Sequence, residues 1–163
     1  AHWAGDAEIT KYLRWDAHRS WAVTAEYLNE VAKQYKQPDF YDWGICVRST
    51  GVLVGNISLA RAEKEPATAW RHAKGELLGE AWEAGYVIGR KWQNEGYATE
   101  ALCAVRDYWF NTVGGSWLTC GHANENVASG AVMQKAGFVY DHDAVYHRFD
   151  GTPVPCRAYY LAK

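Results

Sequence analysis

The stretch at residues 85–101 constrains the fold most, because it joins an apolar strand to an amphipathic helix through a short loop that contains a glycine. The first N–H groups of a helix have no partner within the helix. With the positive end of the helix dipole behind them, such amides form an anion site. Gly96 and Ala98 leave the backbone open to the close approach of a pyrophosphate. The alternative is a plain strand-to-helix turn that requires a glycine.

The remaining sequence alternates strand and helix patterns without an internal repeat or a linker, so one domain is expected over residues 1–163. Helices are predicted near residues 20–35, 98–113 and 126–137, and strands near 41–47, 52–60, 80–88, 117–120, 138–149 and 156–161. Residues 61–79 are polar and without a period, as in a long connection. This order predicts an α/β (α+β) fold with a mixed, mostly antiparallel central sheet flanked by helices.

Charge and hydropathy exclude several classes of protein. The formal charge of −2 argues against a protein that grips nucleic acid by neutralising phosphates. No apolar run approaches the roughly 20 residues that a membrane-spanning helix requires. The printed sequence does not open with a basic and then apolar leader, so a cytoplasmic location is expected.

The four cysteines, Cys46, Cys103, Cys120 and Cys156, are widely spaced and form no C-x-x-C pair. Zinc and redox motifs are therefore not indicated, and no metal site is expected. We expect all four to be buried as small apolar side chains in a reducing compartment.

A second stretch, residues 122–138, carries Asn126 and Ser129 at its helix start and the sequence Lys-Ala-Gly-Phe at residues 135–138. Combined with the Gln-x-x-Gly-x-Ala pattern that begins at Gln93, it resembles the GNAT acetyltransferase superfamily, in particular its RimJ/RimL-like branch of ribosomal-protein N-terminal acetyltransferases. Weaker likeness extends over most of the chain, residues 61–79 excepted. The resemblance implies a GNAT-like fold that uses acetyl-CoA as co-substrate.

The resemblance also implies roles for individual residues. Backbone groups of Tyr86, Val87 and Ile88 would hold the pantetheine arm and the acetyl group, where their strand splays from its neighbour. Amides of the loop would cradle the pyrophosphate, and Asn126 would reach the pantetheine or thioester. The alternative for Asn126 is a simple helix N-cap, and both roles can hold at once. The cofactor-binding residues expected are Tyr86, Val87, Ile88, Gln93, Asn94, Glu95, Gly96, Tyr97, Ala98, Thr99 and Asn126.

Two departures from the family pattern bear on the chemistry. Many members carry a tyrosine that protonates the departing thiolate, where this chain has Met133, which cannot donate a proton. Ser129 is the nearest hydroxyl that could replace it, unless it is a small residue kept for helix packing. The resemblance further implies a first strand and the first half of a helix, and neither is found before Ala1-His-Trp-Ala. Either the chain is truncated or the sheet manages without that strand.

The expected reaction is direct attack of a neutral amine on the acetyl thioester, so the amine must lose a proton. Glu83 is the first candidate for the base, acting through a water, with an exposed structural carboxylate as the alternative. His122 is a weaker candidate for contact with the acceptor, because a histidine at a strand end is more often structural. No Cys–His or Ser–His–Asp arrangement is legible, so no acyl-enzyme is expected.

The amine acceptor stays open at this stage. A protein or peptide N-terminus is favoured by the branch, and a polyamine, an antibiotic amine or another small metabolite is the alternative. A non-catalytic acetyl-CoA-binding regulatory module is a rival that Met133 supports. The glycines lack the G-x-G-x-x-G spacing of a dinucleotide site. No nucleic-acid or membrane partner is expected, and a homodimer is open.

Overall fold

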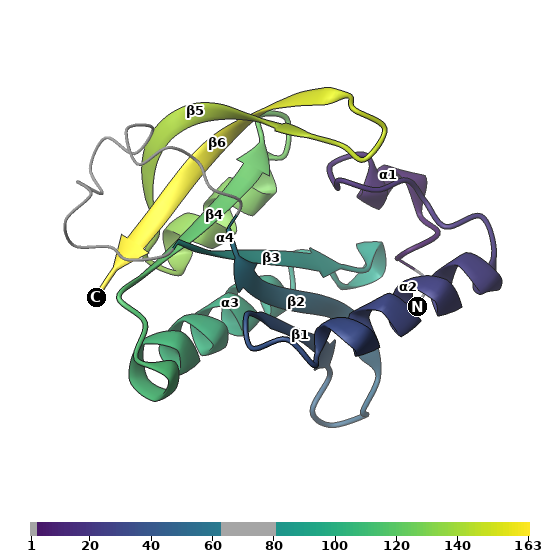
Figure 1. Cartoon of the computed structure of the whole chain (residues 1–163), viewed down its shortest axis with the longest axis horizontal. Coiled ribbons are helices and arrows are strands. Elements are labelled where there is room, and N and C mark those ends of the chain that lie inside the picture. Colours follow the sequence, from purple (N-terminus) through teal and green to yellow (C-terminus); the bar gives the residue numbers. More distant parts are fainter. Residues whose placement is uncertain (1–2, 63–80) are drawn as a thin grey trace.

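The computed structural model describes residues 3–62 and 81–163, which form a six-stranded sheet in the order β1-β2-β3-β4-β6-β5, with helices on both sides (Figure 1). All neighbouring strands are antiparallel except β3 and β4, so the predicted mixed, mostly antiparallel α/β fold is confirmed. The strands are β1 (Phe40–Cys46), β2 (Leu53–Arg61), β3 (Trp82–Ile88), β4 (Trp117–Ala123), β5 (Val139–His147) and β6 (Pro153–Ala162). The helices are α1 (Ala7–Thr10), α2 (Trp21–Gln34), α3 (Tyr97–Tyr108) and α4 (Val127–Lys135), with a short 3-10 turn at Arg90–Trp92 and a π-helical turn at Trp109–Val113.

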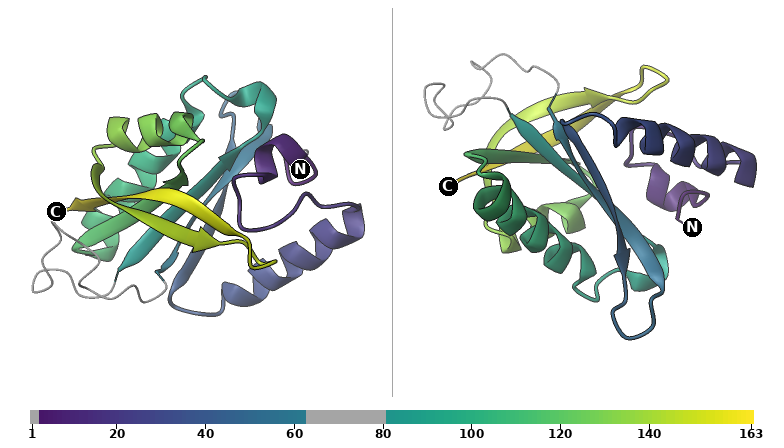
Figure 2. Two further views of the ribbon diagram at one scale, coloured as in Figure 1. Left: turned by 90° about the horizontal axis from the view of Figure 1, so that it is seen from above. Right: turned by 60° about the horizontal axis from the view of Figure 1, so that its bottom comes forward.

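The two faces of the sheet differ in how they are covered (Figure 2). Helices α3 and α4 pack on one face, where Ile57, Leu59, Leu102 and Met133 belong to the main buried core. Side chains alternate along a strand, so the β2 residues next to Ile57 and Leu59 point to the other face. That face looks toward α1 and α2 and carries a wide cleft.

Helix α2 begins as predicted at Ser20, whose hydroxyl accepts a hydrogen bond from the Val23 amide. Its apolar stripe, however, does not enter the core. Trp21 and Leu28 are 71% and 51% exposed, and Thr24 is the residue of α2 that is buried. The stripe lines the cleft instead, which places aromatic and aliphatic side chains opposite the uncovered face of the sheet.

The helical segment that begins with α3 ends at Gly114 as predicted, but its last turn is wound differently. The α-helix stops at Tyr108, and a π-helical turn carries the chain to Gly114, which ends it with a φ of +80°. The Trp109 indole donates to the Trp117 carbonyl at 2.9 Å, and a Cβ at Gly115 would fall 1.9 Å from the Trp109 ring. A close contact between the helix end and β4 therefore accompanies the wider turn.

The predicted burial of all four cysteines is confirmed for two of them and wrong for the other two. Cys120 and Cys156 are buried and all four thiols are free, but Cys46 is exposed and Cys103 is half-buried. Cys46 ends β1 at a shift in register, beside the hairpin turn, where no helix covers the strand. The predicted connection at residues 61–79 lies outside the described residues from position 63 onward.

Candidate active site

Strands β3 and β4 run parallel, and the described residues give their ladder a single pair, Glu83 opposite Thr119. Beyond it the strands separate, and side chains bridge them near the fork. The Thr119 hydroxyl donates to the Trp82 carbonyl at 3.3 Å, and the Cys120 thiol donates to the Ala84 carbonyl at 3.0 Å. A gap therefore opens beside residues 86–88, where the family resemblance implies that the strand splays from its neighbour.

Backbone direction along β3 decides which groups face this gap. Carbonyls of Trp82 and Ala84 accept from β4, whereas the Gly85 carbonyl accepts from Ser58 of β2 at 3.4 Å. Backbone groups alternate from edge to edge along a strand of an antiparallel pair. Tyr86 and Ile88 consequently direct theirs into the gap, while those of Val87 face β2. The predicted role of Val87 therefore has less geometric support than those of Tyr86 and Ile88.

The loop after β3 presents a set of unused amides. Among the described residues, none accepts a hydrogen bond from the N–H groups of residues 94–99. Gly96 stands at the N-cap of α3 with a φ of +89°, and a Cβ built there meets nothing within 4 Å. The space before the helix is thus open to an anion, as the pyrophosphate of acetyl-CoA requires.

Gln93 and Asn94 shape this loop. The Gln93 amide donates to the Arg90 carbonyl at 3.2 Å, and its side chain donates to the Ile88 carbonyl at 3.1 Å. Asn94 has a φ of 64°, a left-handed conformation that asparagine tolerates better than most residues. Gln93 thus fastens the loop to the end of β3, and its predicted contact with the coenzyme remains untested.

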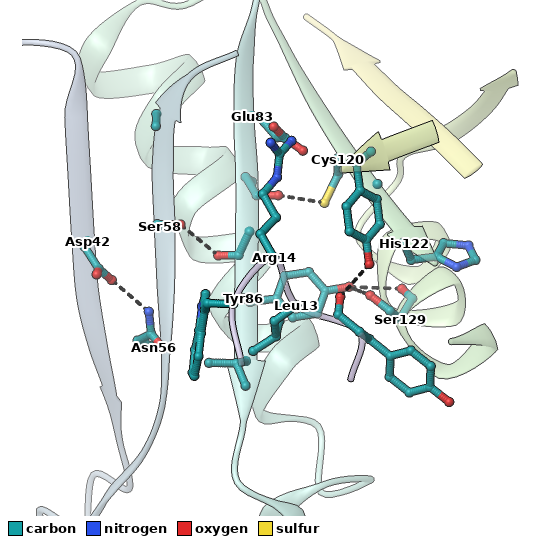
Figure 3. A pocket seen from close by; sticks show the side chains of 18 of the residues that line it. Leu13, Arg14, Asp42, Asn56, Ser58, Glu83, Tyr86, Cys120, His122 and Ser129 are labelled. Carbon is teal, nitrogen blue, oxygen red and sulfur yellow. Dashed lines mark hydrogen bonds between the residues drawn. The ribbon is translucent and has the colours of Figure 1, made fainter. Parts of the chain in front are cut away.

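Helix α4 supplies the second half of the site. The Asn126 side chain caps it by accepting from the Ser129 amide at 3.4 Å, so the N-cap role is present. Ser129, in the first turn, meets the tip of Tyr86. The Tyr86 hydroxyl donates to the Ser129 carbonyl at 3.0 Å and lies 2.8 Å from the Ser129 hydroxyl, where either oxygen can donate (Figure 3).

This contact supplies a tyrosine hydroxyl that the sequence pattern did not locate. The family position for tyrosine holds Met133, which is 1% exposed and part of the core. Tyr86 instead reaches α4 from β3. Burial raises the pKa of the Tyr86 hydroxyl far above its usual value, so the phenol stays protonated and keeps its ability to donate. The sequence identified Tyr86 through its backbone only.

The opposite face of the sheet forms the floor of a cleft of about 1650 Å³, between α2, the loop after α1 and the β5–β6 hairpin. Glu83 lies there, half-buried at the fork of β3 and β4. Arg14 extends toward the same part of the cleft (Figure 3). Glu83 and Ser129 therefore approach the gap from opposite faces of the sheet, which suits a base and an acid on the two sides of a thioester.

His122 sits beneath α4. It is 5% exposed, with Nδ1 2.8 Å from the Ala123 carbonyl and Nε2 3.4 Å from the Tyr159 hydroxyl. A Cβ at Gly130 would fall 2.6 Å from Nε2, so the ring packs directly under the helix. These contacts support the structural alternative for His122, and its predicted contact with the acceptor is untested.

None of the helices among the described residues has the length and apolar character that a membrane-spanning segment requires. Across the same residues, no three His, Cys, Asp or Glu side chains are grouped to hold a metal ion.

Comparison with known proteins identifies the family. The sequence matches the family described as "Acetyltransferase (GNAT) domain" over residues 1–139. It is 27% identical to the uncharacterized N-acetyltransferase YoaA of Bacillus subtilis over 160 residues, which are 96% of this chain and 81% of YoaA.

Solved structures share the fold. The chain aligns with a GNAT-family acetyltransferase from Bacillus anthracis at a TM-score of 0.74 and 19% identity, covering 98% and 84% of the two chains. It aligns with a spermidine N-acetyltransferase from Vibrio cholerae, in complex with CoA and spermine, at a TM-score of 0.73 and 17% identity. The alignment covers 99% of this chain and 86% of the other. It aligns with a ribosomal-protein-S5-alanine acetyltransferase from Vibrio fischeri at a TM-score of 0.69 and 16% identity. The alignment covers 98% of this chain and 85% of the other. With the family match over residues 1–139, these findings show that the chain belongs to the GNAT acetyltransferases, enzymes whose co-substrate is acetyl-CoA.

Proposed function

We propose that this enzyme transfers the acetyl group of acetyl-CoA directly to a primary amine, with the α-amine of a protein or peptide as the favoured acceptor. The observation that carries the proposal is the gap between β3 and β4, which leads from the free amides of residues 94–99 to Glu83 and Ser129. The sequence likeness to the RimJ/RimL branch favours the peptide acceptor, and the size of the cleft gives a peptide room.

In this mechanism the amine nitrogen bonds to the acetyl carbon, the C–S bond breaks and the amine proton passes to Glu83 through a water. A backbone N–H of Tyr86 or Ile88, directed into the gap, donates to the carbonyl oxygen as negative charge develops there. The sulfur takes a proton from the Ser129 hydroxyl, which recovers one from solvent. Positioning both substrates in one gap supplies much of the remaining acceleration.

A mass-spectrometric screen of a peptide and amine library tests this function. The enzyme is incubated with acetyl-CoA, and acetylated products are identified and quantified. We expect acetylation of primary amines, with one free CoA released for each product. Tight CoA binding without any acetylated amine would instead identify a non-catalytic binding module.

Replacing Ser129 with alanine removes the proposed acid. We expect turnover to fall about tenfold, equivalent to about 1.4 kcal/mol, because CoA thiolate leaves readily and needs only moderate assistance. The measurement is kcat on the best acceptor of the screen, with the affinity for acetyl-CoA as the control. A Ser129→Ala enzyme with full kcat would show that solvent protonates the sulfur and that Ser129 serves for packing.

Replacing Tyr86 with phenylalanine tests whether its hydroxyl assists Ser129. If Tyr86 donates to the Ser129 hydroxyl rather than to the Ser129 carbonyl, the serine proton is free to point at the sulfur and is polarised. We expect kcat to fall about threefold to tenfold in Tyr86→Phe, since one neutral hydrogen bond contributes about 1 kcal/mol.

A double-mutant cycle separates this role from mere stabilisation. Adding Tyr86→Phe to Ser129→Ala should lower kcat no further, because both changes act through one proton donor. Independent, multiplying losses would contradict the assignment, and thermal unfolding of each variant reports any structural loss.

A further inference from the structure

Asp42 lies on the floor of the same cleft, in register with the proposed active site. It pairs with Ser58 across β1 and β2, and Ser58 pairs with Gly85 across β2 and β3. Directly paired residues point to one face, so Asp42 shares the face of Glu83, two residues before Gly85. Figure 3 shows Asp42, Asn56 and Ser58 along this floor.

The Asp42 carboxylate is only partly satisfied. The Asn56 side-chain amide donates to one oxygen at 3.1 Å. In the described part of the chain, no cationic side chain forms an ion pair with Asp42. Burial raises the pKa of Asp42, and the hydrogen bond from Asn56 opposes that shift. A half-buried carboxylate without a cation is unfavourable, and a bound cation would relieve that cost.

The walls around Asp42 are aromatic. Tyr27 of α2, Tyr35 at the C-cap of α2 and Phe40 of β1 line the cleft. Burial raises the pKa of both tyrosine hydroxyls, and the Asp42 charge adds to the shift. Aromatic rings that line a cleft together with a carboxylate favour an ammonium or guanidinium group. Two cleft arginines have other partners: Arg61 lies 4.0 Å from Asp39, and Arg148 donates to backbone carbonyls of residues 10–13.

Strand geometry gives the distance between Asp42 and the gap in which the amine reacts. Neighbouring strands lie about 4.8 Å apart and residues rise about 3.3 Å along a strand. Asp42 is therefore about 10 Å from Gly85, beside the gap, and about 12 Å from Glu83. One molecule that spans this distance reaches both the carboxylate and the thioester.

We propose that the acceptor carries a second cationic group about 10 Å from the amine that is acetylated, and that Asp42 binds it. The inference rests on the proposed acetyl transfer and narrows its acceptor to dicationic amines. Two sources share this chemistry, an α,ω-diamine and a peptide with a lysine or arginine close to its N-terminus. Asp42 contributes to binding and not to the chemical step.

The test compares Asp42→Asn with the unchanged enzyme on matched acceptors. Octanediamine, whose nitrogens can lie about 10 Å apart across nine single bonds, is paired with octylamine. Short peptides with lysine at the second or third residue are paired with norleucine peptides. Asp107→Asn is the control, because this exposed aspartate lies on α3, away from the cleft.

We expect Asp42→Asn to raise KM for the dicationic member of a pair about tenfold, as loss of a charge-assisted hydrogen bond predicts. The kcat, and the KM for acetyl-CoA and for the monocationic member, should not change. The matched pair whose KM responds to Asp42→Asn shows whether the acceptor is a diamine or a peptide. Equal effects on both members, or none, would overturn the proposal.

Calorimetry separates this inference from the proposed function. Octanediamine is titrated into the enzyme saturated with CoA, a measurement that needs no turnover. Weaker binding by Asp42→Asn than by Asp107→Asn supports the cationic site even if no amine is acetylated. Identical binding by the two variants, or no binding by either or by the unchanged enzyme, contradicts it.

Discussion

Gly96→Val is expected to weaken acetyl-CoA binding about a hundredfold while the chain still folds. The added side chain would project into the open space before α3, where the pyrophosphate is proposed to meet the amides of residues 94–99. Losing two charge-assisted hydrogen bonds accounts for an effect of this size. Calorimetric titration of acetyl-CoA measures it directly.

Backbone strain alone must be separated from loss of the anion site, because valine at a positive φ is unfavourable wherever it occurs. Gly114 is a matched control: its φ is +80°, against +89° at Gly96, and a Cβ at either position meets nothing within 4 Å. Gly114→Val should lower the unfolding temperature similarly and leave acetyl-CoA affinity intact. Unchanged affinity in Gly96→Val would remove the loop from the coenzyme site.

Glu83→Gln is expected to lower kcat by about 10²–10⁴, the usual consequence of removing a general base. Acetyl-CoA affinity should change little, since the carboxylate lies on the face of the sheet opposite α4. Without the base, the reaction depends on amine that is already neutral, and that fraction grows as pH rises. The pH optimum should therefore move upward.

Rate measurements across pH, with Glu30→Gln as the control, check this expectation. Glu30 is an exposed carboxylate of α2 that pairs with Lys33 at 2.5 Å, so its loss should leave the profile unchanged. If Glu83→Gln keeps full turnover across the range, Glu83 is structural and another group removes the proton.

Local sequence signals predicted most of the fold. The Ser20 cap and helical spacing located α2, alternating side chains located β1, and an apolar run after a turn located β2. Gly96 and Gly114 marked the beginning and end of the helical segment that α3 opens. Each signal depends on residues a few positions apart, which is the range over which periodicity and turn chemistry act.

Features that depend on distant contacts were not predictable in this way. The apolar stripe of α2 has the same spacing whether it faces a core or a cleft, so its exposure at Trp21 and Leu28 could not be foreseen. Tyr86 and Ser129 are 43 positions apart, and their contact requires the first turn of α4 to lie within reach of the Tyr86 side chain. The alignment of Asp42 with Ser58 and Gly85 across three strands likewise depends on strand register, which periodicity alone does not determine.

A crystal structure of the enzyme with CoA tests the central claim most directly. The account predicts pyrophosphate oxygens within hydrogen-bond distance of amides from residues 94–99, and the pantetheine arm in the gap beside Tyr86 and Ile88. The thiol should lie between the Ser129 hydroxyl and the face that carries Glu83. Coenzyme bound elsewhere, with the gap between β3 and β4 left to solvent, would contradict the account.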